Sequence, residues 1–392
     1  MFHQRYIFLT FSRRDIRFLK PLYYISSLLG LTPYYNFEKH SLENLKQQQI
    51  KGVVLTFVLI FGSLFGVVQR YLLLKNLHLS LDFLNDVVNW IIPVIAVINA
   101  SFSNRDKWLR LNNSFQQIDK TFNNRRQQES NLLKNPFFQC VVNVVIFIAI
   151  MSYVFWSWCY HFGVESVLRT YFVHNFCYNS NTILFALITN YALAFRCRYQ
   201  DLNHCLTSDL LMTKYKNGSS LVTLFRRVGT LSRTLSEMVT IFNEIFGWTF
   251  VFMAGKTIAH ILATCMGFLE KDAEVTNIEI RFSSFMITCL SIVNLTLVMC
   301  GTSVTTESSK TAFLCYKLQE HFPPKSDERL EILILAKQVQ ANDVKITAAD
   351  FFEINRRTLC GILATTTTYV IVVLQFKGIF FLINNLLRHT SP

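Results

Sequence analysis

Two ionisable side chains stand one helical turn apart inside an apolar stretch of the sequence. Lys256 lies near the middle of the run 247–269 and His260 follows four residues later, so both fall on one face of a helix. A cation at the centre of a bilayer costs at least about 2.5 kcal/mol on insertion scales, so we expect Lys256 to face a water-filled cavity or a partner. The chemistry that suits such a pair is ligand recognition, with structural hydrogen bonds between helices as the alternative.

Polar and aromatic residues also gather in neighbouring apolar runs, in the halves that the topology derived below directs outward. Such a set is typical of a pocket that is mostly aromatic, with a few polar groups to orient a ligand. For any single Asn, Thr or Tyr, a hydrogen bond between helices competes with this interpretation, and a pair between Asp86 and Lys256 would suit either. The candidate ligand-binding residues are Asp86, Asn89, Trp90, Tyr153, Trp156, His174, Tyr178, Asn181, Lys256, His260, Thr264, Phe285 and Thr288.

The sequence contains none of the usual catalytic or metal-binding motifs. Its 10 Cys form no CxxC pair and have no His at metal spacing, and HExxH, Walker and GxSxG patterns are missing. We therefore expect no enzyme, no metal and no cofactor. Cys159 and Cys177 flank one short loop on the side predicted to be oxidising, where they could form a disulfide or remain two free thiols.

The composition points to the membrane as the place where these residues act. The 392 residues are 51% hydrophobic and only 16% charged, against roughly 25% charged in an ordinary soluble domain. The net charge of +13 does not indicate nucleic acid, because the Lys and Arg residues fall in separate blocks between apolar runs instead of forming one basic surface.

Seven apolar runs are long enough to cross about 30 Å of hydrocarbon. The sequence therefore predicts an all-α membrane protein, a single domain over 1–392 with seven transmembrane helices. The predicted spans lie near 52–71, 82–102, 137–158, 171–195, 247–269, 282–301 and 358–383.

The positive charges set the predicted orientation. Lys and Arg are concentrated in the N-terminal segment and in every second loop after it, and such segments stay cytoplasmic. We expect a cytoplasmic N-terminus and an extracellular C-terminus, the reverse of a G-protein-coupled receptor.

The last predicted cytoplasmic segment, 302–357, leads into the seventh span and should form a helical anchor region. Its stretch ERLEILILAKQVQ places Leu330, Ile334, Leu335 and Val339 at helical spacing. We expect an amphipathic helix that packs against other cytoplasmic helices, with a helix on the inner leaflet as the alternative.

The seventh span carries a narrow polar stripe. Its members step by three and four residues, so they share one helix face: Thr365, Thr368, Val372, Gln375 and Ile379. Several copies of such a helix around a symmetry axis could enclose a water-filled path. The alternative is that the Thr and Gln side chains only bind this span to its neighbours.

A short motif lies within this span. Thr368-Tyr369, the five apolar residues VIVVL, and Gln375-Phe376 resemble the TYhhhhhQF signature of the last span in insect gustatory receptors. The preceding stretch DFFEINRRTLCGILA also resembles that family's lead-in, and seven spans with the N-terminus inside match its topology.

The resemblance implies a ligand-gated, non-selective cation channel in the plasma membrane of a sensory neuron, in its dendrite. It implies a homo- or hetero-tetramer with related subunits, opened by a small-molecule tastant, in which the seventh spans line a central pore. The implied pore and gate residues are Thr365, Thr368, Val372, Gln375, Phe376 and Ile379, with Gln375 and Phe376 at the constriction.

Position 370 narrows the class of ligand that the resemblance implies. Sugar-receptor members typically have Glu directly after the Tyr of the motif, whereas this chain has Val370. The resemblance therefore favours a bitter or otherwise aversive compound, or a co-receptor role, over a sugar.

Two other classes remain as alternatives. A G-protein-coupled receptor would carry an Asp-Arg-Tyr-like motif at the inner end of span three and Asn-Pro-x-x-Tyr in span seven, and neither is present. A secondary transporter would show repeated halves with broken spans, and the sequence has no internal repeat.

Overall fold

The computed structural model describes residues 19–73, 79–123, 152–153, 155–156, 159–160, 163–166, 172–206, 218–270 and 276–390. Most of the third predicted span, 137–158, lies outside these residues.

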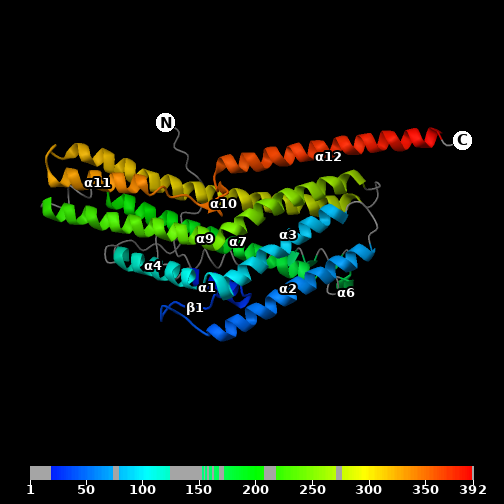
Figure 1. Cartoon of the computed structure of the whole chain (residues 1–392), viewed down its shortest axis with the longest axis horizontal. Coiled ribbons are helices and arrows are strands. Elements are labelled where there is room, and N and C mark those ends of the chain that lie inside the picture. Colours follow the sequence, from blue (N-terminus) through cyan, green and yellow to red (C-terminus); the bar gives the residue numbers. More distant parts are fainter. Residues whose placement is uncertain are drawn as a thin grey trace.

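Helices dominate the described residues, with two short antiparallel hairpins between them (Figure 1). A π-helical turn, Asn99–Ser103, follows α3, and a 3-10 turn, Gln319–His321, follows α10. The hairpins pair β1 (Tyr35–Asn36) with β2 (Ser41–Leu42), and β3 (Thr347–Ala348) with β4 (Phe352–Glu353). The helices are α1 Lys20–Leu28, α2 Leu45–Leu73, α3 Leu79–Ile98, α4 Arg105–Asn123, α6 Val164–Ser166, α7 Phe172–Cys205, α9 Gly218–Glu270, α10 Thr276–Leu318, α11 Asp327–Ala341 and α12 Arg356–Thr390.

The helices contain the predicted spans that fall on described residues, but several continue far past them. Helix α9 has 53 residues, which makes it about 80 Å long, well over twice the thickness of the hydrocarbon core. Figure 1 shows one half of α9 bundled with α4, α7, α10 and α11, and the other half beside α3. Three described stretches are long and apolar enough to cross a bilayer: Leu45–Val68, Phe83–Ser103 and Leu221–Cys265. The count of seven spans and the orientation of the termini stay predictions.

Helix α11 packs against α9 and α10, as expected for the stretch ERLEILILAKQVQ. The face predicted to be buried was partly wrong, because Leu330 and Ile334 are exposed. The buried stripe is Ile332, Leu335, Ala336 and Val339. Two apolar stripes overlap in this sequence, and the buried one includes the small residue Ala336, which lets the neighbouring helices approach.

An aromatic cluster joins the N-terminal segment to three long helices. The ring of Trp108 on α4 lies 5.9 Å from that of Tyr23 on α1, and 5.2 Å from that of Phe246 on α9. Tyr191 on α7 lies 6.1 Å from Trp108, and its hydroxyl donates to Oδ1 of Asn112 at 2.7 Å. These contacts fix α1, α4, α7 and α9 around one buried centre.

A buried ion pair holds α4 to α7. Nη2 of Arg198 donates to both carboxylate oxygens of Asp119 at 2.8 Å, and its Nε donates to Oδ1 at 3.1 Å. The two side chains are only 3% and 5% exposed. A charge pair this far from water depends on both partners being present.

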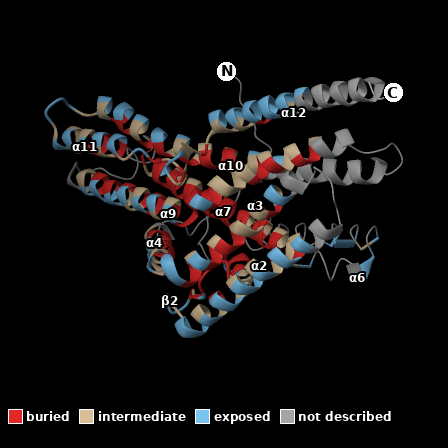
Figure 2. Cartoon of the chain, turned by 45° about the vertical axis from the view of Figure 1, so that its right-hand side comes forward, coloured by how far each residue is buried: buried red, intermediate tan, exposed pale blue. Residues whose placement is uncertain are grey.

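Helix α12 stands apart from the rest of the molecule along most of its described length. It contacts α9 and α10, and Thr366 on the contacting side is buried. Figure 2 shows the described part of α12 mostly in the colour of exposed residues. A helix with so few neighbours in its own chain leaves a broad face open to other partners.

Candidate functional site

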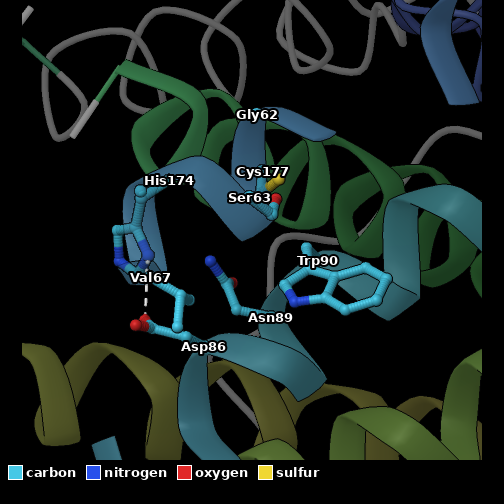
Figure 3. Close-up of a pocket in the computed structure, with 9 residues that line it drawn as sticks. Gly62, Ser63, Val67, Asp86, Asn89, Trp90, His174 and Cys177 are labelled. Carbon is cyan, nitrogen blue, oxygen red and sulfur yellow. Dashed lines mark ion pairs between the residues drawn. The ribbon is translucent and has the colours of Figure 1, made fainter. Parts of the chain in front are cut away.

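A small, narrow cleft lies where α2, α3 and α7 meet (Figure 3). We call it the polar cleft. It unites three residues predicted from α3 and one from α7 with α2 residues that the sequence did not single out. Its lining residues are Gly62, Ser63, Gly66, Val67, Asp86, Asn89, Trp90, His174 and Cys177.

Glycine brings α2 close enough to α7 to form one wall of the polar cleft. A Cβ on Gly62 would lie 2.6 Å from Cγ2 of Val173, so only glycine permits this approach. Gly62 and Gly66 stand four residues apart, a spacing of small residues that is typical of close helix packing in membranes. That spacing is the signal that could have identified α2 as part of the site.

An ion pair between α3 and α7 lies in the polar cleft. Nδ1 of His174 lies 3.1 Å from Oδ1 of Asp86, and the side chains are 15% and 9% exposed. Figure 3 shows the two pointing toward each other across the gap between their helices. The direct partner of Asp86 is thus His174, and Lys256 interacts with the Asp86 carboxylate only as a nearby opposite charge.

Lys256 lies behind Asn89, within a network of neutral partners. Its Nζ donates to Oδ1 of Asn89 at 2.6 Å and lies 4.2 Å from the centre of the Tyr178 ring. Nδ2 of Asn181 donates to the carbonyl oxygen and to Oδ1 of Asn89, at 2.8 and 2.9 Å. Among the described residues, no carboxylate lies within ion-pair distance of this ammonium, which is only 6% exposed. The site therefore holds a cation that a hydrogen-bond acceptor on a ligand could stabilise.

The next two turns of α9 carry His260 and Thr264. Nε2 of His260 is buried and has no hydrogen-bond partner among the described residues. The hydroxyl of Thr264 donates to the carbonyl of His260 at 2.8 Å, so its proton is already committed within the helix.

The structure does not bring every candidate to the polar cleft. Tyr153 and Trp156 are 52% and 61% exposed, so their prediction as pocket walls was wrong. Their rings lie 6.3 Å apart, and Trp156 stacks on Tyr160 at 5.7 Å, so they pack along their own segment. The side chains of Phe285 and Thr288 lie outside the described residues.

Cys159 and Cys177 are both free thiols in the structure, so the disulfide considered between them is not formed. Cys177 is fully buried and hydrogen-bonds with Ser63 of α2, which directs its sulfur into the helix packing.

The polar stripe of α12 lies on the open side of the helix. Four of its members are exposed, namely Thr365, Thr368, Val372 and Gln375. Thr366, the neighbour on the opposite side, is buried, and its hydroxyl donates to the carbonyl of Ile362. The side chains of Phe376 and Ile379 lie outside the described residues.

Comparison with known proteins places this arrangement in a family. A model described as 7tm chemosensory receptor matches residues 19–378, nearly the whole chain. The chain belongs to this family. No curated protein matches this chemosensory receptor.

Solved structures support the same assignment at the level of fold. An insect olfactory receptor, OR5 from Machilis hrabei, is similar over 92% of this receptor and 98% of its own chain, with 14% identity and a TM-score of 0.63. The same olfactory receptor in complex with eugenol is similar over the same shares, with 12% identity and a TM-score of 0.57. The helical fold of this chemosensory receptor therefore resembles that of an insect olfactory receptor.

Proposed function

We propose that this receptor is a gustatory, ligand-gated, non-selective cation channel of the plasma membrane of a sensory neuron, carried on its dendrite. The observation that carries the proposal is the exposed polar stripe of α12. Hydroxyl and amide groups at Thr365, Thr368 and Gln375 would meet lipid in a lone copy of the chain. In a tetramer, of this chain or with related subunits, the four stripes would face a shared axis and line a water-filled pore.

The constriction of the proposed pore lies toward the end of the motif. Gln375 and Phe376 would form it, with Val372 one turn before and Ile379 one turn after. In a tetramer, the Gln375 amides of the four subunits would form a ring around the pore. Apolar side chains next to that ring suit a gate that closes by excluding water.

The proposed ligand is a small, weakly polar molecule that enters the polar cleft. The polar cleft is narrow in this structure, so a small ligand fits it best and would have to displace internal contacts on entry. The related olfactory receptor binds eugenol, an aromatic molecule that makes a reasonable first probe here. An acceptor atom on the ligand would replace Asn89 as the partner of the Lys256 ammonium. A bitter or otherwise aversive non-sugar compound fits these properties, and a co-receptor role is compatible with them.

Ligand binding opens the pore only if the open state binds the ligand more tightly than the closed state. The present packing, in which Lys256 and Asn181 both donate to Oδ1 of Asn89, suits a state without ligand. If the ligand exchanges these internal hydrogen bonds for its own only in the open state, the open state binds the ligand more tightly than the closed state.

Recording from excised membrane patches tests the channel proposal. We expect eugenol to evoke unitary cation currents in inside-out patches without nucleotides, because the pore and the ligand site belong to the same protein. A response that disappears on excision would favour a G-protein-coupled mechanism. Saturable uptake without unitary currents would favour a transporter.

A further inference from the structure

The segment that joins α11 to α12 is fixed to α9 by one side-chain amide. This segment, residues 342–355, contains the β3–β4 hairpin, and we call it the linker hairpin. Nδ2 of Asn243 donates to the carbonyl of Lys345 at 2.8 Å, and its Oδ1 accepts from the N–H of Thr347 at 3.2 Å. Because both halves of the amide bind the backbone, Asn243 sets the position and the orientation of the linker hairpin.

The next turn of α9 leaves the tip of the linker hairpin no free space. A Cβ on Gly247 would lie 2.6 Å from N and 2.9 Å from Cα of Ala349. Ala349 and Asp350 form the tip, with φ values of 48° and 61° in the left-handed region. The ring of Phe351 then packs edge-on against Trp248 at 5.6 Å. Any side chain at position 247 would therefore push the tip away from α9.

The other end of the linker hairpin packs against α10 as closely as its tip packs against α9, and it leads directly into α12. A Cβ on Gly301 of α10 would lie 2.7 Å from the carbonyl oxygen of Ile354. The next residue, Asn355, caps α12, because its Oδ1 accepts from the N–H of Thr358 at 3.1 Å. Helix α12 thus begins directly after a backbone that α9 and α10 hold on both sides.

The two helices that hold Lys256 and its partner Asn89 meet at the level of the linker hairpin. Lys256 lies nine residues beyond Gly247, about 14 Å along the same continuous helix. Asn99, at the start of the π turn that ends α3, donates from Nδ2 to the carbonyl of Ile245 on α9 at 3.2 Å. Turns of this kind frequently mark functional sites.

We propose that the linker hairpin transmits ligand binding from the polar cleft to α12, with Asn243, Gly247 and Gly301 as positioning residues. The inference rests on the proposed function, because it requires a ligand in the cleft and a pore along α12. A shift of α9 or α3 moves the hairpin as one piece, since the amide and glycine contacts leave no slack between them. The first turn of α12 follows that movement.

A matched pair of substitutions on α9 tests the transmission. Gly247→Ala places a methyl group against the backbone of Ala349, whereas Gly255→Ala, two turns further on, meets nothing within 4 Å. We expect Gly247→Ala to reduce the maximal eugenol-evoked current about 2- to 30-fold, with the current of Gly255→Ala equal to wild type. Binding of tritiated eugenol and the amount of receptor at the cell surface should be the same in both variants.

Phe351→Ala provides a second variant if Gly247→Ala fails to reach the surface. Phe351 is 69% exposed, so its truncation removes the contact with Trp248 without opening a buried cavity. We expect it to lower the current in the same direction while eugenol binding is retained. Currents equal to those of Gly255→Ala would overturn the transmission, and so would a parallel loss of eugenol binding, which would assign the hairpin to the cleft itself. If eugenol neither binds nor opens the wild-type receptor, the proposed function fails first, and the transmission fails with it.

Discussion

Lys256→Met is expected to raise the eugenol concentration for half-maximal current about tenfold or more. Methionine keeps an unbranched apolar chain but removes the ammonium that now donates to Asn89 and lies over Tyr178. A hydrogen bond to a charged group contributes about 1.5–3 kcal/mol, and each 1.4 kcal/mol corresponds to a tenfold change in affinity. Concentration–response curves from whole-cell currents measure the shift.

The amount of receptor at the cell surface distinguishes a ligand contact from a structural role for Lys256. Removal of a charge from a span favours insertion, so we expect Lys256→Met to reach the surface at wild-type levels. Lys310→Met is the matched control, because Lys310 is 55% exposed on a distant part of α10. A variant that loses surface expression, or that responds like Lys310→Met, would contradict the ligand role.

Asp119→Ala is expected to lower the free energy of unfolding by about 3–5 kcal/mol. The substitution leaves the Arg198 guanidinium buried without its carboxylate partner. The total free energy of unfolding of a protein is about 5–15 kcal/mol, so this loss is a large fraction of it. The midpoint temperature of thermal unfolding, measured for the receptor in detergent, should therefore fall clearly.

Two comparisons show whether burial of the charge is the cause. Glu331→Ala removes the partner of Arg226, whose side chain is 70% exposed, and should cost only about 0–1 kcal/mol. The double variant Asp119→Leu with Arg198→Met removes both buried charges and should be more stable than Asp119→Ala. Equal effects of Asp119→Ala and Glu331→Ala would contradict this account of the ion pair.

Much of the architecture was predictable because it follows from one-dimensional patterns. Long apolar runs mark the helices, and the described part of the seventh predicted span does lie within one helix, α12. The signature Thr368-Tyr369 and Gln375-Phe376 led to the family that the whole-chain match establishes. These patterns can be recognised in the sequence because each depends on residues of a single helix.

The site was less predictable because it depends on how helices rotate and approach one another. Asp86 and Lys256 are opposite charges in neighbouring spans, yet the direct ion-pair partner of Asp86 is His174 on α7. Gly62 decides how closely α2 approaches, and an apolar sequence pattern gives no measure of that distance. Ala349 adopts a left-handed backbone conformation that alanine rarely takes, so the sequence did not predict the linker hairpin.

Cysteine scanning of α12 tests the central claim, that this helix lines a pore opened by ligand. Cys360 is free and exposed on the same helix, so it is first replaced by Ser. Single Cys residues from 365 to 379 are then treated with a permeant thiol reagent during eugenol-evoked current. We predict block at positions 365, 368, 372, 375 and 379, and no block at 366, whose side chain is buried against the receptor. Block that ignores this three-to-four-residue spacing, or no block at any position, would contradict the claim.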